Sequence, residues 1–117
     1  MSDQITFEDF KRAEIRIGKI IACEKVVDAD KLLKLQVDFG IDPKTNLPAV
    51  RQVVSGIAES FTPEELVGKK LPFIVNLEYR KFKGEESQGM LMATGTEEGK
   101  VILLEPTGEV PEGAEVV

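Results

Sequence analysis

The sequence predicts an all-β domain that folds as a small closed barrel, and three observations support this prediction. Apolar and polar residues alternate in several short segments, which is the period of half-buried strands. Corners containing Gly or Pro separate these segments, and the clearest helix signal is brief and lies mid-chain. With 117 residues and a hydrophobic share of 42%, residues 1–117 are expected to form a single domain with its own core.

The N-terminal third is expected to contain a short helix followed by a strand. Thr6 can cap a helix over residues 6–10, with Asp9 three residues further on. Residues 14–20 then alternate polar and apolar side chains and predict a strand. Gly18 interrupts that strand, so we expect a β-bulge or a bend at this glycine.

Two further strands are expected before the middle of the chain. A polar turn over residues 28–30 leads into a second strand at 33–39. Residues 40–48 contain two prolines and predict a loop, which a third strand at 50–55 follows. The side chains of the second strand that should face inward are Leu33, Leu35, Val37 and Phe39.

The second half of the chain completes the predicted barrel. Thr62 as cap, Pro63 at the first helical position and Glu65 three residues after the cap predict a short helix that ends at Gly68. Strands are then expected at 71–75, 89–95 and 101–104. A short helix between the third and fourth strands of a five-stranded Greek-key barrel is the arrangement of an OB-fold. The spacing of the strands alone is also compatible with β-sandwiches and SH3-like barrels.

The composition excludes the common catalytic and metal sites. One Cys and no His rule out disulfide frameworks, Cys/His zinc sites, Ser-His-Asp triads and Cys-His dyads. Cys23 lies in an apolar stretch and is expected to be a small buried thiol. Asp28 and Asp30 lack the later Gly and Glu of a calcium loop, and no phosphate-cradling glycine loop occurs. We therefore expect no catalytic activity, no metal and no cofactor.

The chain carries no recognisable targeting or membrane signal. The first residues have neither a basic region nor an apolar region of the kind that begins a signal peptide. No apolar run approaches the roughly 18 residues of a membrane span. A cytoplasmic protein with no membrane partner is expected.

Charge is unevenly distributed along the chain. The net charge of −6 argues against a nucleic-acid ligand, because phosphate affinity depends mainly on Lys and Arg. Residues 69–83, however, contain five basic residues and one acid, whereas residues 97–117 contain six acids and one Lys. A local positive face matters more for docking than the total charge.

Residues 76–90 are the densest group of candidate binding residues. Arg80, Lys81 and Lys83 lie within four positions of one another, beside Tyr79 and Phe82. Cations contact phosphates, and aromatic or guanidinium planes stack on bases, so this stretch predicts contact with nucleic acid. The alternative is a solvated basic loop whose Phe82 packs inward.

Several stretches, in one order along almost the whole chain, are similar to a known family. They are residues 9–10, 15–20 (Ile-Arg-Ile-Gly-Lys-Ile), 30–35 (Asp-Lys-Leu-Leu-Lys-Leu), 51–57 (Arg-Gln-Val-Val-Ser-Gly-Ile), 63–69 (Pro-Glu-Glu-Leu-Val-Gly-Lys), 76–81 (Asn-Leu-Glu-Tyr-Arg-Lys) and 87–90 (Ser-Gln-Gly-Met). The chain resembles the tRNA-binding domain appended to methionyl-tRNA synthetases. It is also similar to stand-alone bacterial tRNA-binding proteins, a yeast synthetase cofactor and the endothelial monocyte-activating polypeptide.

This resemblance implies an OB-fold that binds tRNA through shape and backbone, near the outer corner of the L, without strict sequence choice. It also implies a homodimer and a methionyl-tRNA synthetase as a possible partner. Asn76 and residues 87–90 would shape the groove, while the cations meet phosphates; Lys83 is added as a basic neighbour. The binding residues carried over from the family are Lys31, Lys34, Arg51, Asn76, Arg80, Lys81, Ser87 and Met90.

Some features leave alternatives open. Tyr79 stands where many relatives have Pro, and the loop at 41–49 is longer than the family's tight hairpin. A branch of the family resembles export chaperones, so the alternative function is a dimeric module that binds peptides. Met1 begins the chain and no catalytic-domain motif is present, which favours a free-standing subunit over a fragment of a synthetase.

Overall fold

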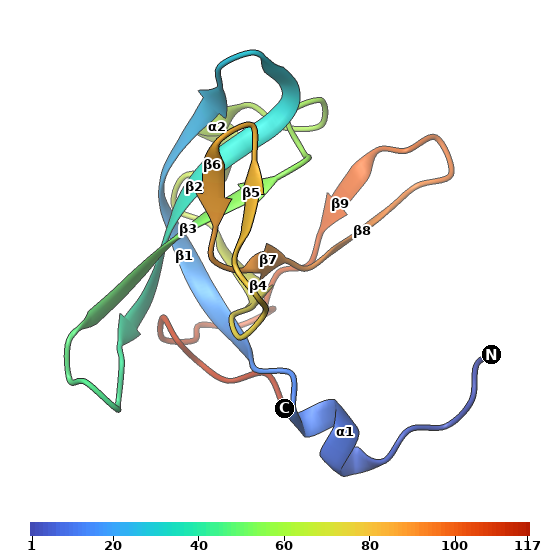
Figure 1. Ribbon diagram of the computed structural model, residues 1–117, viewed down its shortest axis with the longest axis vertical. Coiled ribbons are helices and arrows are strands. Elements are labelled where there is room, and N and C mark those ends of the chain that lie inside the picture. The colour runs from blue at the N-terminus through green and yellow to red at the C-terminus, as the bar shows by residue number, and fades with distance from the viewer.

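Strands dominate the structure, as the alternating pattern predicts. A computed structural model describes all 117 residues and contains nine strands and two short helices (Figure 1). In chain order these are α1 (Phe7–Lys11), β1 (Ile15–Val26), β2 (Ala29–Ile41), β3 (Pro48–Ser55), α2 (Pro63–Leu66), β4 (Lys70–Ile74), β5 (Arg80–Phe82), β6 (Glu85–Ser87), β7 (Met90–Leu91), β8 (Ala93–Gly95) and β9 (Val101–Leu103).

The central sheet is antiparallel and curls into a half-barrel. Its strand order is β3-β2-β1-β4-β7, with α2 between β3 and β4 as predicted. The edge strand β3 returns toward the end of β6, where the Gln88 N–H donates to the carbonyl of Gln52 at 2.7 Å. The predicted OB-type barrel is therefore confirmed.

The inward face of β2 forms the centre of the core, as predicted. Leu33, Leu35 and Val37 are fully buried, and Phe39 is 7% exposed. Phe39 meets Phe73 of β4 edge to face, with ring centroids 5.6 Å apart. The remaining buried residues of this cluster, from β1, β3, the segment that follows β3, α2, β4 and β7, include Ile20, Val53, Ile57, Leu66, Leu71 and Leu91.

Both predicted helix starts are present. Thr6 and Asp9 form a reciprocal capping box at α1. At α2 the Glu65 carboxylate accepts from the Thr62 backbone N–H at 3.0 Å and from its hydroxyl at 3.1 Å. These bonds hold the pKa of Glu65 below its usual range. Each helix is therefore fixed by its own first turn.

The bulge expected at Gly18 is wrong in position. Gly18 pairs regularly with Leu71, and the register shifts instead between Ile20 and Ala22. A Cβ at Gly18 would overlap the side chains of Val37 and Phe39. The glycine therefore permits close packing of β2 over β1 and does not mark a bend.

Other element boundaries differ from the sequence-based expectations. β1 and β2 are longer than predicted, and their turn falls at Val27 and Asp28, where Asp28 has φ 60°. The strand expected at 89–95 is split into β7, which pairs with β4, and β8, which pairs with β9. The strand expected at 101–104 is present as β9.

The C-terminal residues pair with the part of β1 that β2 does not reach. The Ile17 N–H donates to the carbonyl of Ala114 at 2.8 Å, and the Gly113 N–H donates back to Ile17 at 2.7 Å. The Val116 N–H donates to Ile15 at 2.9 Å. This segment therefore closes an otherwise open strand edge.

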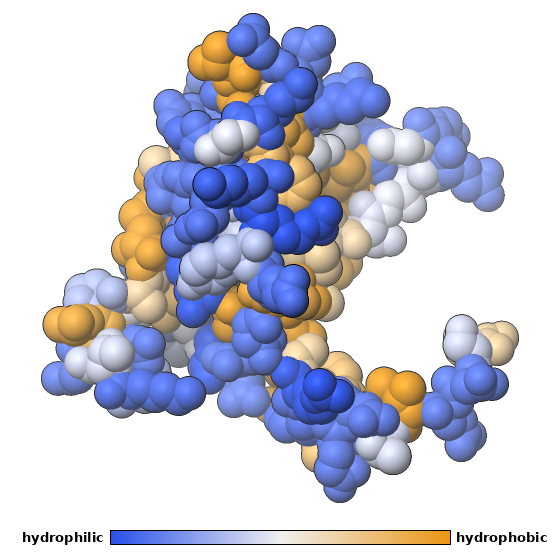
Figure 2. Space-filling view, viewed as in Figure 1, coloured by the Kyte–Doolittle hydropathy of each residue, from blue (hydrophilic) through white to orange (hydrophobic).

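Two elements stand off the barrel. In Figure 1, α1 with the N-terminal residues and the β8–β9 hairpin extend away from the sheet, and α1 has no buried residue. Hydrophilic residues cover the face that carries β5 and β6 (Figure 2). Neither helix is long and apolar enough to cross a membrane.

Candidate nucleic-acid interface

The densest group of predicted binding residues lies on a β-hairpin. β5 and β6 pair with Arg80 opposite Ser87 and Phe82 opposite Glu85. The turn is two residues long, and both Lys83 (φ 52°) and Gly84 (φ 81°) adopt positive φ. The sequence analysis expected no strands between residues 75 and 89, and Lys-Gly is a weaker turn signal than Asn-Gly or Asp-Gly.

Three cations project from this hairpin into solvent. Arg80, Lys81 and Lys83 are exposed, and none of them forms an ion pair. The Arg80 guanidinium carbon lies 4.9 Å from the centroid of the half-buried Phe82 ring. The hairpin thus presents three cations without an ion-pair partner close to one aromatic side chain, with Glu86 opposite Lys81 on the neighbouring strand.

A shallow groove with apolar walls runs beside these cations. It encloses about 60 Å³, and its wall includes Arg80 and Glu78 together with the apolar side chains of Leu77, Phe82 and Met90. Leu77 is 43% exposed and Met90 46%. Cations next to exposed apolar side chains can hold a phosphate while contacting a flat base or ribose.

Ser87 is buried and pins the hairpin to the barrel. Its hydroxyl accepts from the Val54 N–H at 2.9 Å and donates to the carbonyl of Gly89 at 2.9 Å. The hydroxyl therefore forms its hydrogen bonds within the protein, and these bonds hold the end of β6 next to β3.

Asn76 and Arg51 also use their side chains within the protein. Asn76 accepts from the Glu14 N–H at 2.8 Å and donates to the carbonyl of Arg12 at 2.7 Å. The Arg51 guanidinium donates to the carbonyls of Val75 and Gln88. Both residues therefore shape the segments before and after the hairpin.

Lys34 lies beside the hairpin with its charge compensated. Its ammonium is 2.9 Å from Glu24 and 3.3 Å from Glu85, and hydrogen bonds to these two carboxylates raise the pKa of Lys34. Lys31, on the same strand, is exposed and forms no ion pair. Of these two predicted cations, Lys31 is the one available to a ligand.

The chain matches a family profile described as "Putative tRNA binding domain" over residues 15–115. This chain belongs to that tRNA-binding domain family. Methionine–tRNA ligases are similar to it: the one from Flavobacterium johnsoniae is 49% identical over 114 residues, and the one from Methanocorpusculum labreanum is 47% identical over 112 residues. Those alignments cover 97% and 96% of this chain but only 15% of each ligase, so the chain spans a small part of these relatives.

Solved structures resemble the domain over its full length. The MetRS related protein from Pyrococcus horikoshii has a TM-score of 0.88 and 42% identity, with 99% of this chain and 100% of that chain covered. The chaperone CsaA from Bacillus anthracis has a TM-score of 0.83 and 27% identity, with 98% and 100% covered. The family is a binding module, whereas the ligases that contain it are enzymes.

A glutamine network that sequence reasoning missed supports the hairpin of this tRNA-binding domain. The Gln52 side chain donates to the carbonyl of Glu86 at 2.8 Å and accepts from Gln36 at 3.1 Å. Its backbone N–H donates to the Gln88 side chain at 3.1 Å. Outward glutamines on two adjacent strands, Gln36 and Gln52, are the signal that could have indicated it.

The basic run at residues 69–83 does not form one patch. The ammonium of Lys69 pairs with Glu105 at 3.2 Å, and that of Lys70 lies 3.9 Å from both Glu109 and Glu112. The acidic C-terminal residues therefore compensate the two lysines at the start of β4. The hairpin cations of the tRNA-binding domain stay uncompensated.

The long loop predicted near the site lies at the far end of its two strands. The Asp42 N–H donates to the carbonyl of Leu47 at 2.9 Å, and Asn46 closes the turn with φ 58°. In Figure 1 this β2–β3 turn points away from β5 and β6. Lys34 and its partner Glu85 mark the opposite end of β2, next to the hairpin.

Proposed function

We propose that this domain binds folded tRNA through the β5–β6 hairpin and the groove beside it, by shape and backbone and without strict sequence choice. The observation that carries the proposal is the hairpin with Arg80, Lys81 and Lys83 uncompensated. Such cations supply affinity for phosphate but carry no base readout. Lys31 extends the basic surface, while Lys34, Arg51, Asn76 and Ser87 hold it in shape, and Met90 contributes apolar contact.

The domain assists a methionyl-tRNA synthetase in the cytoplasm, either as an appended domain or as a free subunit. Support comes from the methionine–tRNA ligases, in which the matching segment is 15% of the length. A module that holds tRNA raises the concentration of tRNA at the catalytic domain without any chemistry of its own. No step of catalysis is assigned to its residues.

The domain acts as a homodimer. Apolar side chains are exposed on the elements that stand off the barrel: Phe7 is 70% exposed, Phe10 40% and Ile102 42%. A second copy of the domain that covers these side chains would bury apolar surface that α1 leaves exposed. Sedimentation should show a dimer, and a monomer at every protein concentration would contradict this part of the proposal.

The proposal is tested by gel shift against total tRNA and against an unstructured strand of the same length. Folded tRNA should bind and the linear strand should bind much more weakly, because a rigid hairpin fits a fixed spacing of phosphates. Equal affinity for the two RNAs would contradict recognition of the folded shape, because it would show that the domain attracts any RNA by charge alone. A mixture of several purified tRNAs should bind alike if sequence choice is weak.

A second candidate function is peptide binding, which the likeness to the chaperone CsaA and the exposed Leu77 and Met90 favour. The two functions respond differently to Arg80→Ala plus Lys81→Ala. A peptide site built on apolar contact should tolerate that change, whereas a tRNA site should not. Competition between an unfolded polypeptide and total tRNA, with and without the double substitution, separates them.

A further inference from the structure

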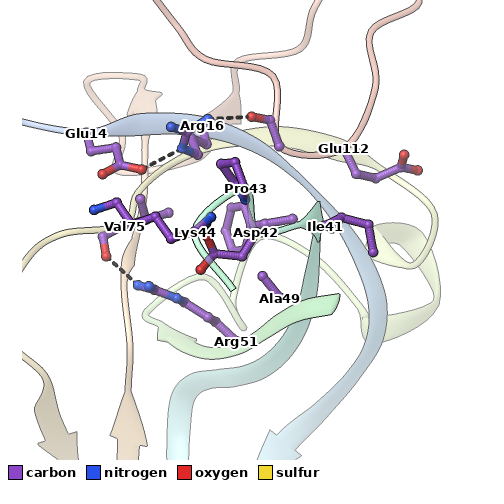
Figure 3. A pocket seen from close by; sticks show the side chains of 12 residues that line it. Glu14, Arg16, Ile41, Asp42, Pro43, Lys44, Ala49, Arg51, Val75 and Glu112 are labelled. Atoms are coloured by element: carbon purple, nitrogen blue, oxygen red, sulfur yellow. Dashed lines mark hydrogen bonds and ion pairs between the residues drawn. The ribbon is translucent and has the colours of Figure 1, made fainter. Parts of the chain in front are cut away.

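A larger hollow lies outside the groove beside the hairpin. It has a volume of about 230 Å³ and is bounded by the start of β1, the β2–β3 turn and the C-terminal residues 112–113 (Figure 3). Lys31, Arg80, Lys81 and Met90 take no part in its wall. It therefore forms a site separate from the proposed tRNA surface, although Arg51 borders it.

The apolar part of the wall limits the size and character of a ligand. Phe39, Ile41, Ala49 and Val75 are its hydrophobic residues. Pockets for drug-sized molecules have volumes of about 300–1,000 Å³. The present cavity is smaller, so it suits a molecule of the size of one amino acid with an apolar side chain.

The polar part of the wall is charged and balanced. Three basic residues (Arg16, Lys44 and Arg51) and three acidic residues (Glu14, Asp42 and Glu112) line it. A simple anion or a simple cation would face as many like charges as opposite ones, which is unfavourable in a partly enclosed site. A molecule that carries both charges can match both sets.

Several of these charged groups could still form an ion pair with a ligand. Arg16 and Glu14 pair with each other at 2.5 Å, but Lys44 forms no ion pair. The guanidinium of Arg51 bonds to backbone carbonyls only and meets no carboxylate within ion-pair distance. The only ion pair of the Glu112 carboxylate is with Lys70, at the long distance of 3.9 Å. In Figure 3, Arg51 and Glu112 lie on opposite sides of the hollow.

We propose that this cavity binds a free α-amino acid with an apolar side chain. The carboxylate is recognised by Lys44 and Arg51, and the ammonium by the acidic residues across the cavity. The apolar side chain packs on Phe39 and Ala49. This site shares Arg51 with the support of the hairpin, but no residue that projects from the hairpin contributes to it.

The test is a titration of the isotope-labelled protein, observed by two-dimensional NMR of its backbone amides. L-leucine should shift the amides of Lys44, Ala49 and Gly113 saturably at millimolar concentrations. N-acetyl-L-leucine lacks the ammonium and L-leucinamide lacks the carboxylate, so each should produce no saturable shift. Equal binding of either derivative, or no saturable shift with L-leucine, L-methionine or L-valine, overturns the proposal.

Two substitutions locate the site. Ala49→Leu fills the cavity and should abolish the leucine shifts, whereas Val50→Leu, on the opposite face of the same strand, should preserve them. Lys44→Gln removes an exposed charge without a structural partner and should weaken binding about tenfold. Unchanged leucine affinity in Lys44→Gln, or in Ala49→Leu with a native spectrum, rejects the site. Gel shifts with tRNA should be unchanged in Ala49→Leu, so failure here is distinguishable from failure of the tRNA proposal.

Discussion

The side chains of Arg80 and Lys81 form no hydrogen bond or ion pair within the protein, unlike those of Lys34, Arg51, Asn76 and Ser87. Both are exposed and neither is ion-paired, so their removal should leave the fold intact. We predict that Arg80→Ala plus Lys81→Ala weakens tRNA binding by about 1–3 kcal/mol. Gel-shift titration measures the affinity, and urea unfolding checks that stability is retained.

The matched control removes one arginine and one lysine elsewhere. Arg12 and Lys25 are also exposed and form no ion pair, and Arg12 meets Asn76 only through its backbone carbonyl. Arg12→Ala plus Lys25→Ala should change tRNA affinity by much less. If both double variants lose the same affinity, total charge rather than the hairpin governs binding.

Cys23, the only thiol, is half-buried and not fully buried as the sequence predicts, but this partial burial is enough to raise its pKa. Desolvation, with smaller contributions from the nearby carboxylates of Glu64 and Glu24, raises the pKa of Cys23 to about 11. We predict that alkylation of the native protein accelerates only as the pH approaches that value. In urea the rate should rise near the ordinary thiol pKa of about 8.5. A native profile identical to the unfolded one would contradict the burial.

The sign of the effect on stability follows from the same shift. The native state keeps the thiol proton above the pH at which the unfolded chain loses it. Its contribution to stability is therefore complete below the unfolded pKa and is lost as the pH rises through the folded pKa. The raised pKa of Lys34 acts in the same direction, so the protein should lose stability in strongly alkaline solution.

The hairpin depends on one buried hydroxyl for its attachment to β3. Ser87→Ala leaves the Val54 N–H without its acceptor in a buried position. We predict a loss of about 1–3 kcal/mol in the free energy of unfolding, measured with urea. Ser55→Ala, on β3 but without a side-chain hydrogen bond, should be close to neutral. A neutral Ser87→Ala would show that water replaces the hydroxyl.

The side chains of β2 that pack against β1 leave no room for a side chain at position 18. Gly18→Ala would place a methyl group against Val37 and Phe39. We predict a destabilisation of about 1–3 kcal/mol, measured by thermal and urea unfolding. Gly108→Ala is the control, because a Cβ there meets nothing within 4 Å. Equal stability of the two variants would mean that β2 shifts to accommodate the methyl group.

Local chemistry explains which elements were predictable from the sequence. The caps at Thr6 and Thr62 and the inward face of β2 depend on near neighbours in the chain, so they were predicted correctly. The need for a glycine at position 18 and the hydrogen bonds of the Ser87 hydroxyl depend on residues of other strands. Such long-range contacts leave no local pattern, and they decide which predicted site residues are free to meet a ligand.

Pairing between distant segments also resolves the contradiction between a net charge of −6 and a nucleic-acid ligand. The acidic C-terminal segment is fastened along β1 and engages Lys69, Lys70 and Lys11. Its charge is thereby held on elements other than the hairpin. Sequence counting grouped Lys69 and Lys70 with Arg80, because adjacency in the chain does not show which acid lies opposite each cation in the fold.

This separation of charge predicts how tRNA affinity responds to salt. If roughly four phosphates are neutralised per protomer, the logarithm of the binding constant should fall with the logarithm of salt concentration at a slope of about −3 to −4. The variant with Arg80 and Lys81 replaced by Ala should have a slope smaller in magnitude by about two, because each lost phosphate contact removes about one. The Arg12→Ala plus Lys25→Ala control should keep the original slope, since its cations lie outside the proposed contact. Gel shifts across a salt series provide the measurement. If the binding constant of the unmodified protein did not change with salt concentration, phosphates would not be its principal contacts, even though the hairpin cations are exposed.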